Sequence, residues 1–457
     1  MKGLIIFWAV AAFFIPVGTW FCAKWSWARR LVVIGMIWST CESSRLSINF
    51  VSREFYRAMS RGFEVCSADL CAVALLLAMI LRRKREPLRL FVPLSLPFVL
   101  FFVIGVCSWM TAARSLDVSP LATYIPYDHF ETRLYPWFEL FKVARAFLVY
   151  FVIVNYIRDE ATLKTVVSGL VITAVYLTGV VLFDRYVLGI NRVRGTLGHP
   201  NSLATYMAMM ATVSFCFALH SRKWREGLLY LVPVAMGGVC VVMAISRGGL
   251  LALAFGLTNS LLLLLPRNFS VKNWVLVIIG VIGGMAIMGK AANTLMARFV
   301  GEQDVKSDME YRSLYNTQAK LMAREHFFGV GLGNFSAWSF EKYAAELDED
   351  FPPGTPPHNI WFLILGETGY LGVFAFFLIW ARFYSLTFPL LLKGKNSLML
   401  TGVIAGTCAT LAGQVQNMLQ LGFRQSPLYF LNHICLGMAV AGWYYLKPSR
   451  EALPRKS

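Results

Sequence analysis

Long apolar runs separated by short polar connectors fill most of this chain, and the pattern predicts membrane-spanning helices. A helix needs about 20 predominantly apolar residues to cross the hydrocarbon layer of a bilayer. Backbone groups in lipid must be hydrogen-bonded within the protein, and the runs lack the period-2 alternation of a membrane β-barrel. The expected fold class is therefore an all-α, polytopic membrane bundle. The later runs cover residues 65–81, 90–112, 135–157, 165–189, 198–219, 228–245, 249–265, 274–292, 358–380, 398–418 and 428–446.

The N-terminal part of the chain is less regular. Gly3–Cys22 is long enough for a crossing, and bulky residues rather than a small-residue cleavage site follow it, so no removable signal peptide is expected. Leu31–Cys41 is short for a crossing. Counting both runs gives about 13 transmembrane helices with the N-terminus outside, and counting one gives about 12 with both termini inside. We favour the smaller number.

Composition excludes a soluble globular protein, because 57% of the 457 residues are hydrophobic and only 15% are charged. The net charge of +18 would favour a nucleic-acid partner in a soluble protein. Here the basic residues occupy separate short connectors, as the positive-inside rule predicts for the cytoplasmic loops of a membrane protein. No nucleic-acid partner is therefore expected. The inward connectors under this rule are 82–89, 220–226, 266–273, 393–395 and 447–457.

The nine cysteines indicate neither a metal site nor a disulfide framework. Most of them lie within or beside the apolar runs and lack paired metal-ligand spacing. The chain also contains no HExxH motif and no Walker lysine. We expect no metal and no cofactor.

Strict alternation places the remaining connectors outside, and one of them is a long polar stretch, residues 293–357. Glu310–His326 contains no Pro or Gly and predicts a helix within it. The glycines of Gly329–Phe335 end that helix and predict a tight fold-back, since no strand precedes them as a dinucleotide site requires. We expect one membrane domain over residues 1–457, with 293–357 as a cap on its outer face. The other outer connectors are 113–134, 184–197, 246–248 and 419–427.

Several arginines lie at the expected outer membrane edge. Arg247, between two apolar runs, either faces a polar cavity or extends its guanidinium from a tight turn toward the headgroups. Arg192 and Arg194 precede a turn that either caps the next helix, through His199 or Asn201, or binds phosphate. Arg312 lies in the polar stretch, and the usual explanation for an arginine there is a charge that is solvated by water. Several such cations on one face would suit a diphosphate, because guanidinium groups bind phosphate oxygens bidentately.

His358 is the sharpest candidate for chemistry. A histidine at the start of a helix is by itself more often a cap or an interfacial group. Beside an outer arginine cluster it becomes a candidate general base, because an imidazole titrates near neutrality. Asn359 follows directly. Glu367, roughly half a span deeper in the membrane, is expected to be structural or to line a cavity.

These motifs, in this order, resemble the O-antigen ligase and polymerase superfamily of bacterial envelope proteins. The resemblance covers roughly residues 165–440, and each motif is short, so that their order and membrane placement carry the specificity. The region from Ser47–Phe50 to Arg61–Glu64 also looks like ligase-family proteins of exopolysaccharide clusters. The motifs are Gly195–Asn201, Ser246–Gly249, Arg312, Gly329–Phe335, His358–Asn359 and Glu367–Gly369.

The resemblance implies an inner-membrane glycosyltransferase that uses an undecaprenyl-diphosphate-linked glycan as donor. Transfer would occur on the periplasmic face, without metal or cofactor and with inversion at the anomeric carbon. Arg247 and Arg312 would hold the diphosphate, and His358 would orient or deprotonate the acceptor hydroxyl. The partners would be the donor lipid, a lipid or saccharide acceptor, and membrane lipids. The resemblance further implies that four residues of this chain bind the substrate: Arg194, Asn201, Asn359 and Glu367.

The acceptor separates three functions within the same architecture. A ligase transfers the glycan to lipid A–core, a repeat-unit polymerase transfers it to another lipid-linked repeat, and a protein O-glycosyltransferase transfers it to a hydroxyl side chain. We expect ligase or polymerase chemistry. A membrane transporter is the alternative from another class, and Glu367 and Gln414 are the intramembrane polar groups that would favour it.

Overall fold

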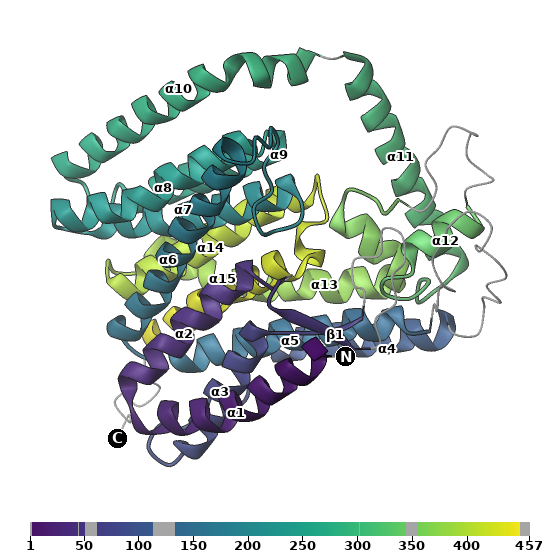
Figure 1. Cartoon of the computed structure of the whole chain (residues 1–457), viewed down its shortest axis with the longest axis horizontal. Helices are drawn as coiled ribbons and strands as arrows, with labels where there is room; N and C mark the ends of the chain where they lie inside the picture. Colours follow the sequence, from purple (N-terminus) through teal and green to yellow (C-terminus); the bar gives the residue numbers. More distant parts are fainter. Residues whose placement is uncertain are drawn as a thin grey trace, which may run out of the picture.

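A computed structural model describes residues 2–43, 45–50, 62–112, 133–300, 302–343 and 355–447. The long helices run alongside one another across Figure 1, with α11 and α12 at one end of the molecule. The helices are α1 (Lys2–Lys24), α2 (Ser26–Cys41), α3 (Ser67–Leu81), α4 (Ser95–Ala112), α5 (Tyr135–Tyr156), α6 (Glu160–Tyr186), α7 (Pro200–His220), α8 (Trp224–Met243), α9 (Arg247–Leu264), α10 (Val271–Val300), α11 (Glu302–Glu325), α12 (Phe335–Glu341), α13 (Ile360–Lys393), α14 (Leu398–Asn417), the 3₁₀-helix η2 (Gly422–Arg424) and α15 (Ser426–Leu446).

Every apolar run predicted from the sequence contains a helix, so the mostly helical fold class is confirmed. Of the helices in the described ranges, seven are long and apolar enough to cross a membrane. The total of about 12 crossings stays a prediction. Helix α5 is absent from the seven although it has 22 residues. It carries Glu139, Lys142 and Arg145, three charged side chains that lie buried inside the protein.

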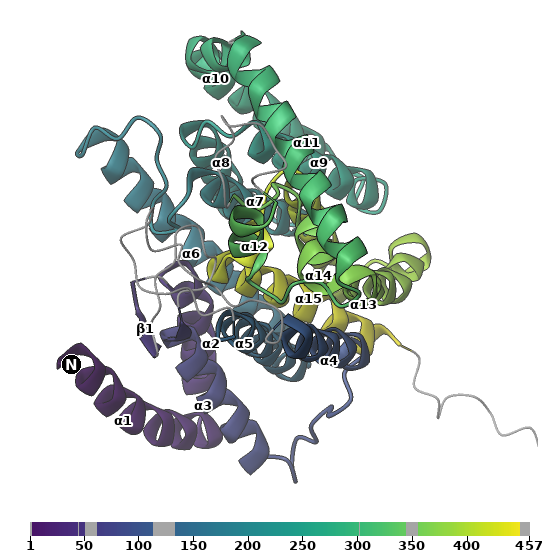
Figure 2. The same ribbon diagram turned by 90° about the vertical axis from the view of Figure 1, so that its right-hand side faces the viewer.

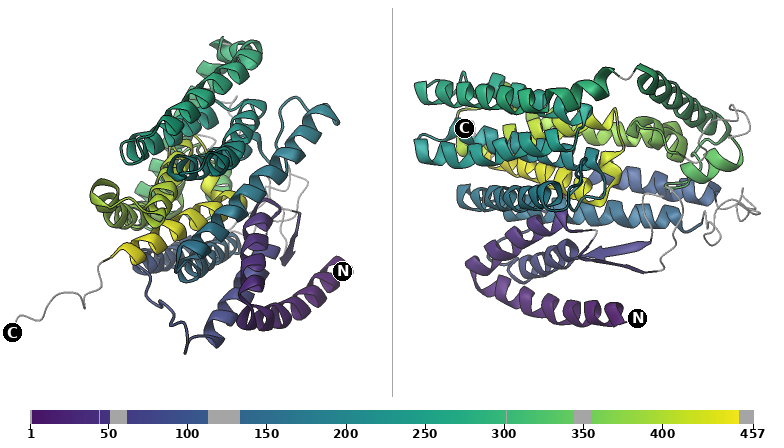
Figure 3. Two further views of the ribbon diagram at one scale, coloured as in Figure 1. Left: turned by 90° about the vertical axis from the view of Figure 1, so that its left-hand side faces the viewer. Right: turned by 45° about the horizontal axis from the view of Figure 1, so that its top comes forward.

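Helix α7 forms the centre of the bundle. The apolar window of this helix is fully buried, and it packs against α8, α9 and α14. Small residues let these helices approach closely, as is usual where helices associate in lipid. A Cβ atom added at Gly256 of α9, for example, would overlap Thr212 of α7. The two views in Figure 3 show this closely packed group of helices from the side and from one end.

Two short strands near the N-terminus were not predicted from the sequence. β1 (Ser47–Phe50) pairs antiparallel with β2 (Phe63–Cys66), so that Ser47 faces Cys66 and Phe50 faces Phe63. The all-α prediction is corrected to this extent within the described chain. Four residues per strand are too few for a reliable period-2 signal, so the pairing depends on contacts with the helices.

The polar stretch 293–357 is more helical than the sequence indicated. Helix α10 continues to Val300, past the expected end of its apolar run, and α11 begins at Glu302, before the predicted helix at Glu310. Figure 1 shows α11 turning away from the end of α10 toward α12. The acidic run Glu346–Asp350 and most of the connector 113–134 lie outside the described residues.

The glycine motif of the polar stretch folds back onto a break in α13, as the predicted fold-back required. Gly369 interrupts α13 with φ = 66° and ψ = −172°. The break leaves helix carbonyls without their usual partners, and the glycine turn supplies donors. The N–H groups of Val330 and Gly331 donate to the carbonyls of Gly366 and Glu367 at 3.0 and 2.9 Å. The hydroxyl of Ser108 also donates to the Glu367 carbonyl, at 2.6 Å.

Gly369→Ala is expected to destabilise the protein by at least about 1–3 kcal/mol, the usual cost of a non-glycine residue in strained backbone. Its φ lies in the left-handed region, and an added Cβ would overlap the carbonyl oxygen of Phe327. Thermal unfolding in detergent measures the effect. Gly179→Ala is the matched control, because nothing lies within 4 Å of a Cβ at that exposed helical glycine. Equal melting temperatures for the two variants would contradict the tight fold-back.

Candidate functional site

The helix ends that carry the predicted site residues meet at one end of the bundle, which faces the viewer in Figure 2. At the start of α9, Gly248 lies against Gln416, near the end of α14. The next residue of α14, Asn417, accepts a hydrogen bond from the Phe423 N–H in η2 at 2.8 Å. In turn η2 reaches α13, because Arg424 forms an ion pair with Glu367.

The opposite ends of α9 and α13 also meet. Arg267, just beyond α9, donates a hydrogen bond to the carbonyl of Leu391, near the end of α13. The two helices therefore run in the same direction and begin at the same end of the bundle. Arg247 is the first residue of α9, and His358 lies two residues before α13. The structure thus places Arg247 and His358 at one end of the molecule.

A strained turn holds Arg247. Ile245 has φ = 50°, a left-handed conformation that is rare for a β-branched residue and costs about 1–3 kcal/mol. The Ser246 hydroxyl caps α9 by accepting from the Gly249 N–H at 3.2 Å. From a neighbouring loop, Arg192 donates to the carbonyl of Ala244 at 3.3 Å. Backbone strain of this kind collects at functional sites and persists only where surrounding contacts hold it, as the bonds of Ser246 and Arg192 do beside the half-buried Arg247.

Arg312 lies on α11 and His358 lies just before α13, and these two helices pack together. Arg312 is a half-buried residue of α11, and α11 packs along α13. On the same helix, Lys320 lies over the ring of Phe362, at the start of α13, at 5.5 Å. Asn359 caps α13, and its side chain accepts from the Trp361 N–H at 2.9 Å. This cap fixes the chain directly after His358, so the α11–α13 contact brings the elements of Arg312 and His358 side by side.

The turn before α7 is a capping turn. His199 Nδ1 accepts from the Asn201 N–H at 3.1 Å, which confirms the capping role expected for this histidine. Arg192 donates to Asn201 Oδ1 at 3.2 Å, and Ser202 donates to Gln425, beside η2. Arg194 is exposed. Of the two arginines in this loop, Arg192 therefore makes the contacts that position the helix ends at this end of the bundle.

A buried ion network lies beneath this end of the bundle. Arg424 contacts Glu367 at 2.5 Å and Glu139 at 3.0 Å. Lys142 binds Glu139 at 2.9 Å and donates to the Arg424 carbonyl at 2.6 Å. No side chain of the four is more than 9% exposed. Burial opposes the charge on Arg424, but the carboxylates of Glu139 and Glu367 outweigh it and raise the pKa of this guanidinium above its ordinary value.

The space beside this network is too small for a sugar. The cavity lined by Glu139, Lys142, Arg424 and Tyr429 measures about 20 Å³, enough for about one water molecule. Two cations and two carboxylates also balance one another, which leaves no excess charge for a diphosphate. The contacts of Glu367 fit a structural role, one of the two that the sequence left open for this acid, and its assignment as a substrate-binding residue stays a prediction.

A second buried ion group connects the strand pair to the bundle. Arg145 of α5 contacts Asp69 of α3 at 2.7 Å and Glu64 of β2 at 3.3 Å. The Ser426 hydroxyl, at the start of α15, donates to Glu64 at 2.8 Å. These contacts explain why the two short strands are held in place despite their length.

Sequence reasoning missed Glu139, Lys142, Arg145 and Arg424. A signal for the first three was present, because charged residues inside an apolar run are expensive in lipid and must find partners. Arg424 gave a weaker signal, since a connector at the membrane edge normally contains charge. Its pairing partners are 57 and 285 residues away in the sequence, so no local pattern identifies them.

Part of the chain matches a known protein family. Residues 232–377 match the model of the family described as O-antigen ligase. The match begins inside α8 and ends inside α13, so it includes Arg247, Arg312 and His358. It lies within the 165–440 region of the resemblance. No curated protein matches the chain.

Proposed function

We propose that the protein is an envelope glycosyltransferase, because the match supports the O-antigen ligase superfamily. It would move a glycan from undecaprenyl diphosphate to an acceptor hydroxyl at the periplasmic face of the bacterial inner membrane. The helical bundle and its apolar spans support a multi-pass membrane protein. The observation that carries the proposal is the placement of Arg247 and His358 at one end of the bundle, inside the matched segment.

The proposed reaction uses cations to stabilise the leaving group and a base to activate the acceptor. The acceptor oxygen attacks the anomeric carbon while the bond from that carbon to the diphosphate oxygen breaks. Arg247 and Arg312 stabilise the negative charge that develops on the departing diphosphate, which already leaves readily. His358 takes the proton of the acceptor hydroxyl. Attack from the face opposite the leaving group inverts the anomeric configuration.

The test is transfer by the purified protein. The protein in detergent would be incubated with a defined undecaprenyl-diphosphate oligosaccharide and three acceptors in separate reactions: lipid A–core, a second lipid-linked repeat, and a hydroxyl-bearing peptide. Mass analysis of the products should show one acceptor enlarged by the glycan mass, together with released undecaprenyl diphosphate. Vesicles that show solute flux without transfer to any acceptor would instead support a transporter.

Arg247→Ala is expected to lower the rate of transfer by about 10²–10³-fold, the usual effect of losing one preorganised group that stabilises developing negative charge. Arg247→Lys should recover only part of this loss, because an ammonium group keeps the charge but loses the bidentate geometry. Initial rates at saturating donor measure both variants. Arg185→Lys is the control, since this half-buried arginine binds the Asn191 carbonyl in the neighbouring outer connector 184–197. Parental rates in Arg247→Ala would contradict the assigned role.

A further inference from the structure

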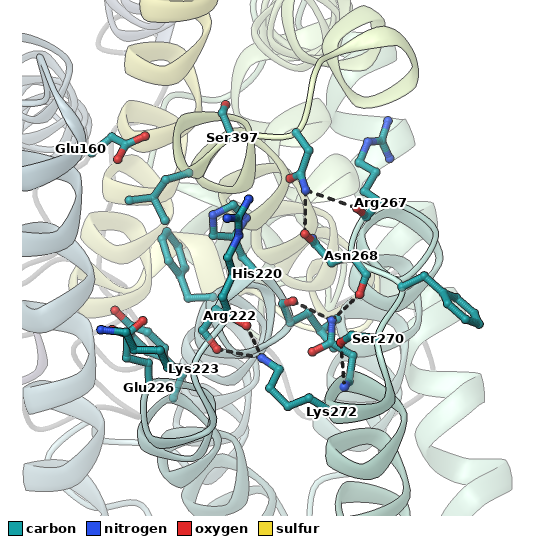
Figure 4. Close-up of a pocket in the computed structure, with 18 of the residues that line it drawn as sticks. Glu160, His220, Arg222, Lys223, Glu226, Arg267, Asn268, Ser270, Lys272 and Ser397 are labelled. Atoms are coloured by element: carbon teal, nitrogen blue, oxygen red, sulfur yellow. Dashed lines mark hydrogen bonds between the residues drawn. The ribbon is translucent and has the colours of Figure 1, made fainter.

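A cavity of about 810 Å³ opens at the end of the bundle opposite Arg247 and His358. The walls are the connectors 220–226 and 266–273, residues 396–398, and the beginning of α6 (Figure 4). Arg267, which marks this end through its bond to Leu391, is part of the lining. Cavities of this size commonly hold small molecules or headgroups, and the proposed glycan transfer makes no use of this end.

The lining of this cavity carries an excess of positive charge. Five basic side chains face two carboxylates, Glu160 and Glu226, and within the described chain none of the seven forms an ion pair. Such a cavity attracts anions, and guanidinium and ammonium groups are the usual ligands of phosphate. The basic residues are Lys164, Arg222, Lys223, Arg267 and Lys272.

Two of these cations are already engaged by the protein, and three are not. Lys272 is buried and donates to the carbonyl and hydroxyl of Ser221 and to the Ala218 carbonyl, at the end of α7. Arg267 donates to carbonyls at the ends of α9 and α13. By contrast, Lys164, Arg222 and Lys223 are exposed, and none of their side chains has a hydrogen bond to a described residue. These three are available to a ligand.

Two asparagines of the lining present buried polar atoms without a partner. Asn268 Nδ2 and Asn273 Oδ1 are buried and make no hydrogen bond, although the rest of each side-chain amide is engaged. Asn273 is only 1% exposed. An unmade hydrogen bond at a buried polar atom is costly. Both atoms are shielded from solvent, so they belong to the wall of the cavity and give no direct contact to a ligand.

Exposed aromatic side chains place this cavity at the level of lipid headgroups. Phe269 lines the cavity and is 76% exposed, and Trp274 contacts its ring at a centroid distance of 6.2 Å. Trp224, at the start of α8, is 46% exposed. Aromatic residues of this kind collect at membrane–water interfaces. Below them, α8 and α10 expose apolar side chains such as Leu229 and Ile278, on which acyl chains could lie.

We propose that this cavity binds the headgroup of an anionic glycerophospholipid of the inner leaflet. The phosphate lies between Arg222, Lys223 and Lys164. The basic connectors place this end at the cytoplasmic surface, where anionic lipids attract basic residues. The site is independent of glycan transfer, and a protein inactive as a transferase would still have it.

The test is a lipid titration of the purified full chain. Phosphatidylglycerol, phosphatidylcholine, glycerol 3-phosphate and inorganic phosphate would be added separately to the protein in a neutral detergent. Bound lipid would be counted by native mass spectrometry, and the melting temperature followed. Phosphatidylglycerol should bind and raise the melting temperature, whereas phosphatidylcholine and the two soluble anions should do neither. The double variant Arg222→Gln/Lys223→Gln should bind phosphatidylglycerol about 30-fold more weakly, at roughly fivefold for each cation.

The matched control is the double variant Arg225→Gln/Lys395→Gln, which removes the same charge from the same end of the bundle, one residue in the connector 220–226 and one in 393–395. Both residues are exposed, and neither lines the cavity. This control should bind the lipid nearly as tightly as the parent. An equal loss of affinity in both double variants would mean that only the general basic surface matters, and would overturn the site. Equal stabilisation by soluble phosphate would overturn the lipid as its ligand.

Discussion

Arg424→Met is expected to lower the free energy of unfolding by about 3–5 kcal/mol, the usual effect of breaking a buried ion pair from one side. Arg424 is the group that contacts both Glu367 of α13 and Glu139 of α5. Without it, Glu367 loses the cation that binds its carboxylate, in a position only 2% exposed. Glu139 keeps Lys142, so the cost falls mainly on Glu367. Thermal or denaturant unfolding in detergent measures the change.

Two further variants separate the charge effect from lost packing. Arg382→Met removes an exposed arginine from the same helix as Glu367 and should change the stability little. The double variant Arg424→Met/Glu367→Gln should recover part of the loss, because the uncompensated buried carboxylate is gone. If Arg424→Met melted like the parent, Glu367 would have to reach water or another cation, and the buried network would be contradicted.

His358→Ala is expected to lower the rate of transfer by about 10²–10⁴-fold, the usual contribution of a general base. The residue is half-buried and precedes α13, whose first turn is capped by Asn359, so the helix start should survive the substitution. Initial rates with the acceptor identified by mass analysis measure the effect. An unchanged melting temperature would show that the loss is chemical.

His358→Gln distinguishes two roles of His358, orienting the acceptor hydroxyl and removing its proton. A glutamine amide can hold a hydroxyl by a hydrogen bond but cannot accept its proton. We expect this variant to be nearly as slow as His358→Ala, and parental rates in it would refute the base. His326→Ala is the control histidine. The His326 ring packs on Trp338 at 4.6 Å, and burial together with Lys342 lowers the pKa of this imidazole. This variant should keep the transfer rate.

The positions of the helices followed from local sequence. An apolar run long enough to cross a bilayer must form its backbone hydrogen bonds within itself, as a helix. Runs such as 198–219 and 398–418 could therefore be predicted as helices without tertiary information. The cap on α7 was equally local, because His199 binds an N–H only two residues away. The fold-back of Gly329–Phe335 was also expected, since spaced glycines end a helix wherever it lies.

The candidate site was only partly predictable. Arg247, Arg312 and His358 were selected from residue type, membrane edge and order along the chain. Their relative placement required the contacts at both ends of α9 and α13. The break at Gly369 was not predicted, because a single glycine in an apolar run is compatible with an unbroken helix. It became necessary only because the turn at Gly329 occupies the space beside it.

By itself the sequence determined a helical membrane bundle, the basic connectors at one of its surfaces and the arginines and histidine at the other. Each of these follows from the composition of a short segment and the energy of burying it in lipid. Only the tertiary structure decided which charges are buried, with Arg424 reaching Glu139 across 285 residues, and which remain open, as Arg222 and Lys223 do. The reason is that a charge inside the membrane is tolerated only with a partner, and that partner is chosen by packing between distant helices.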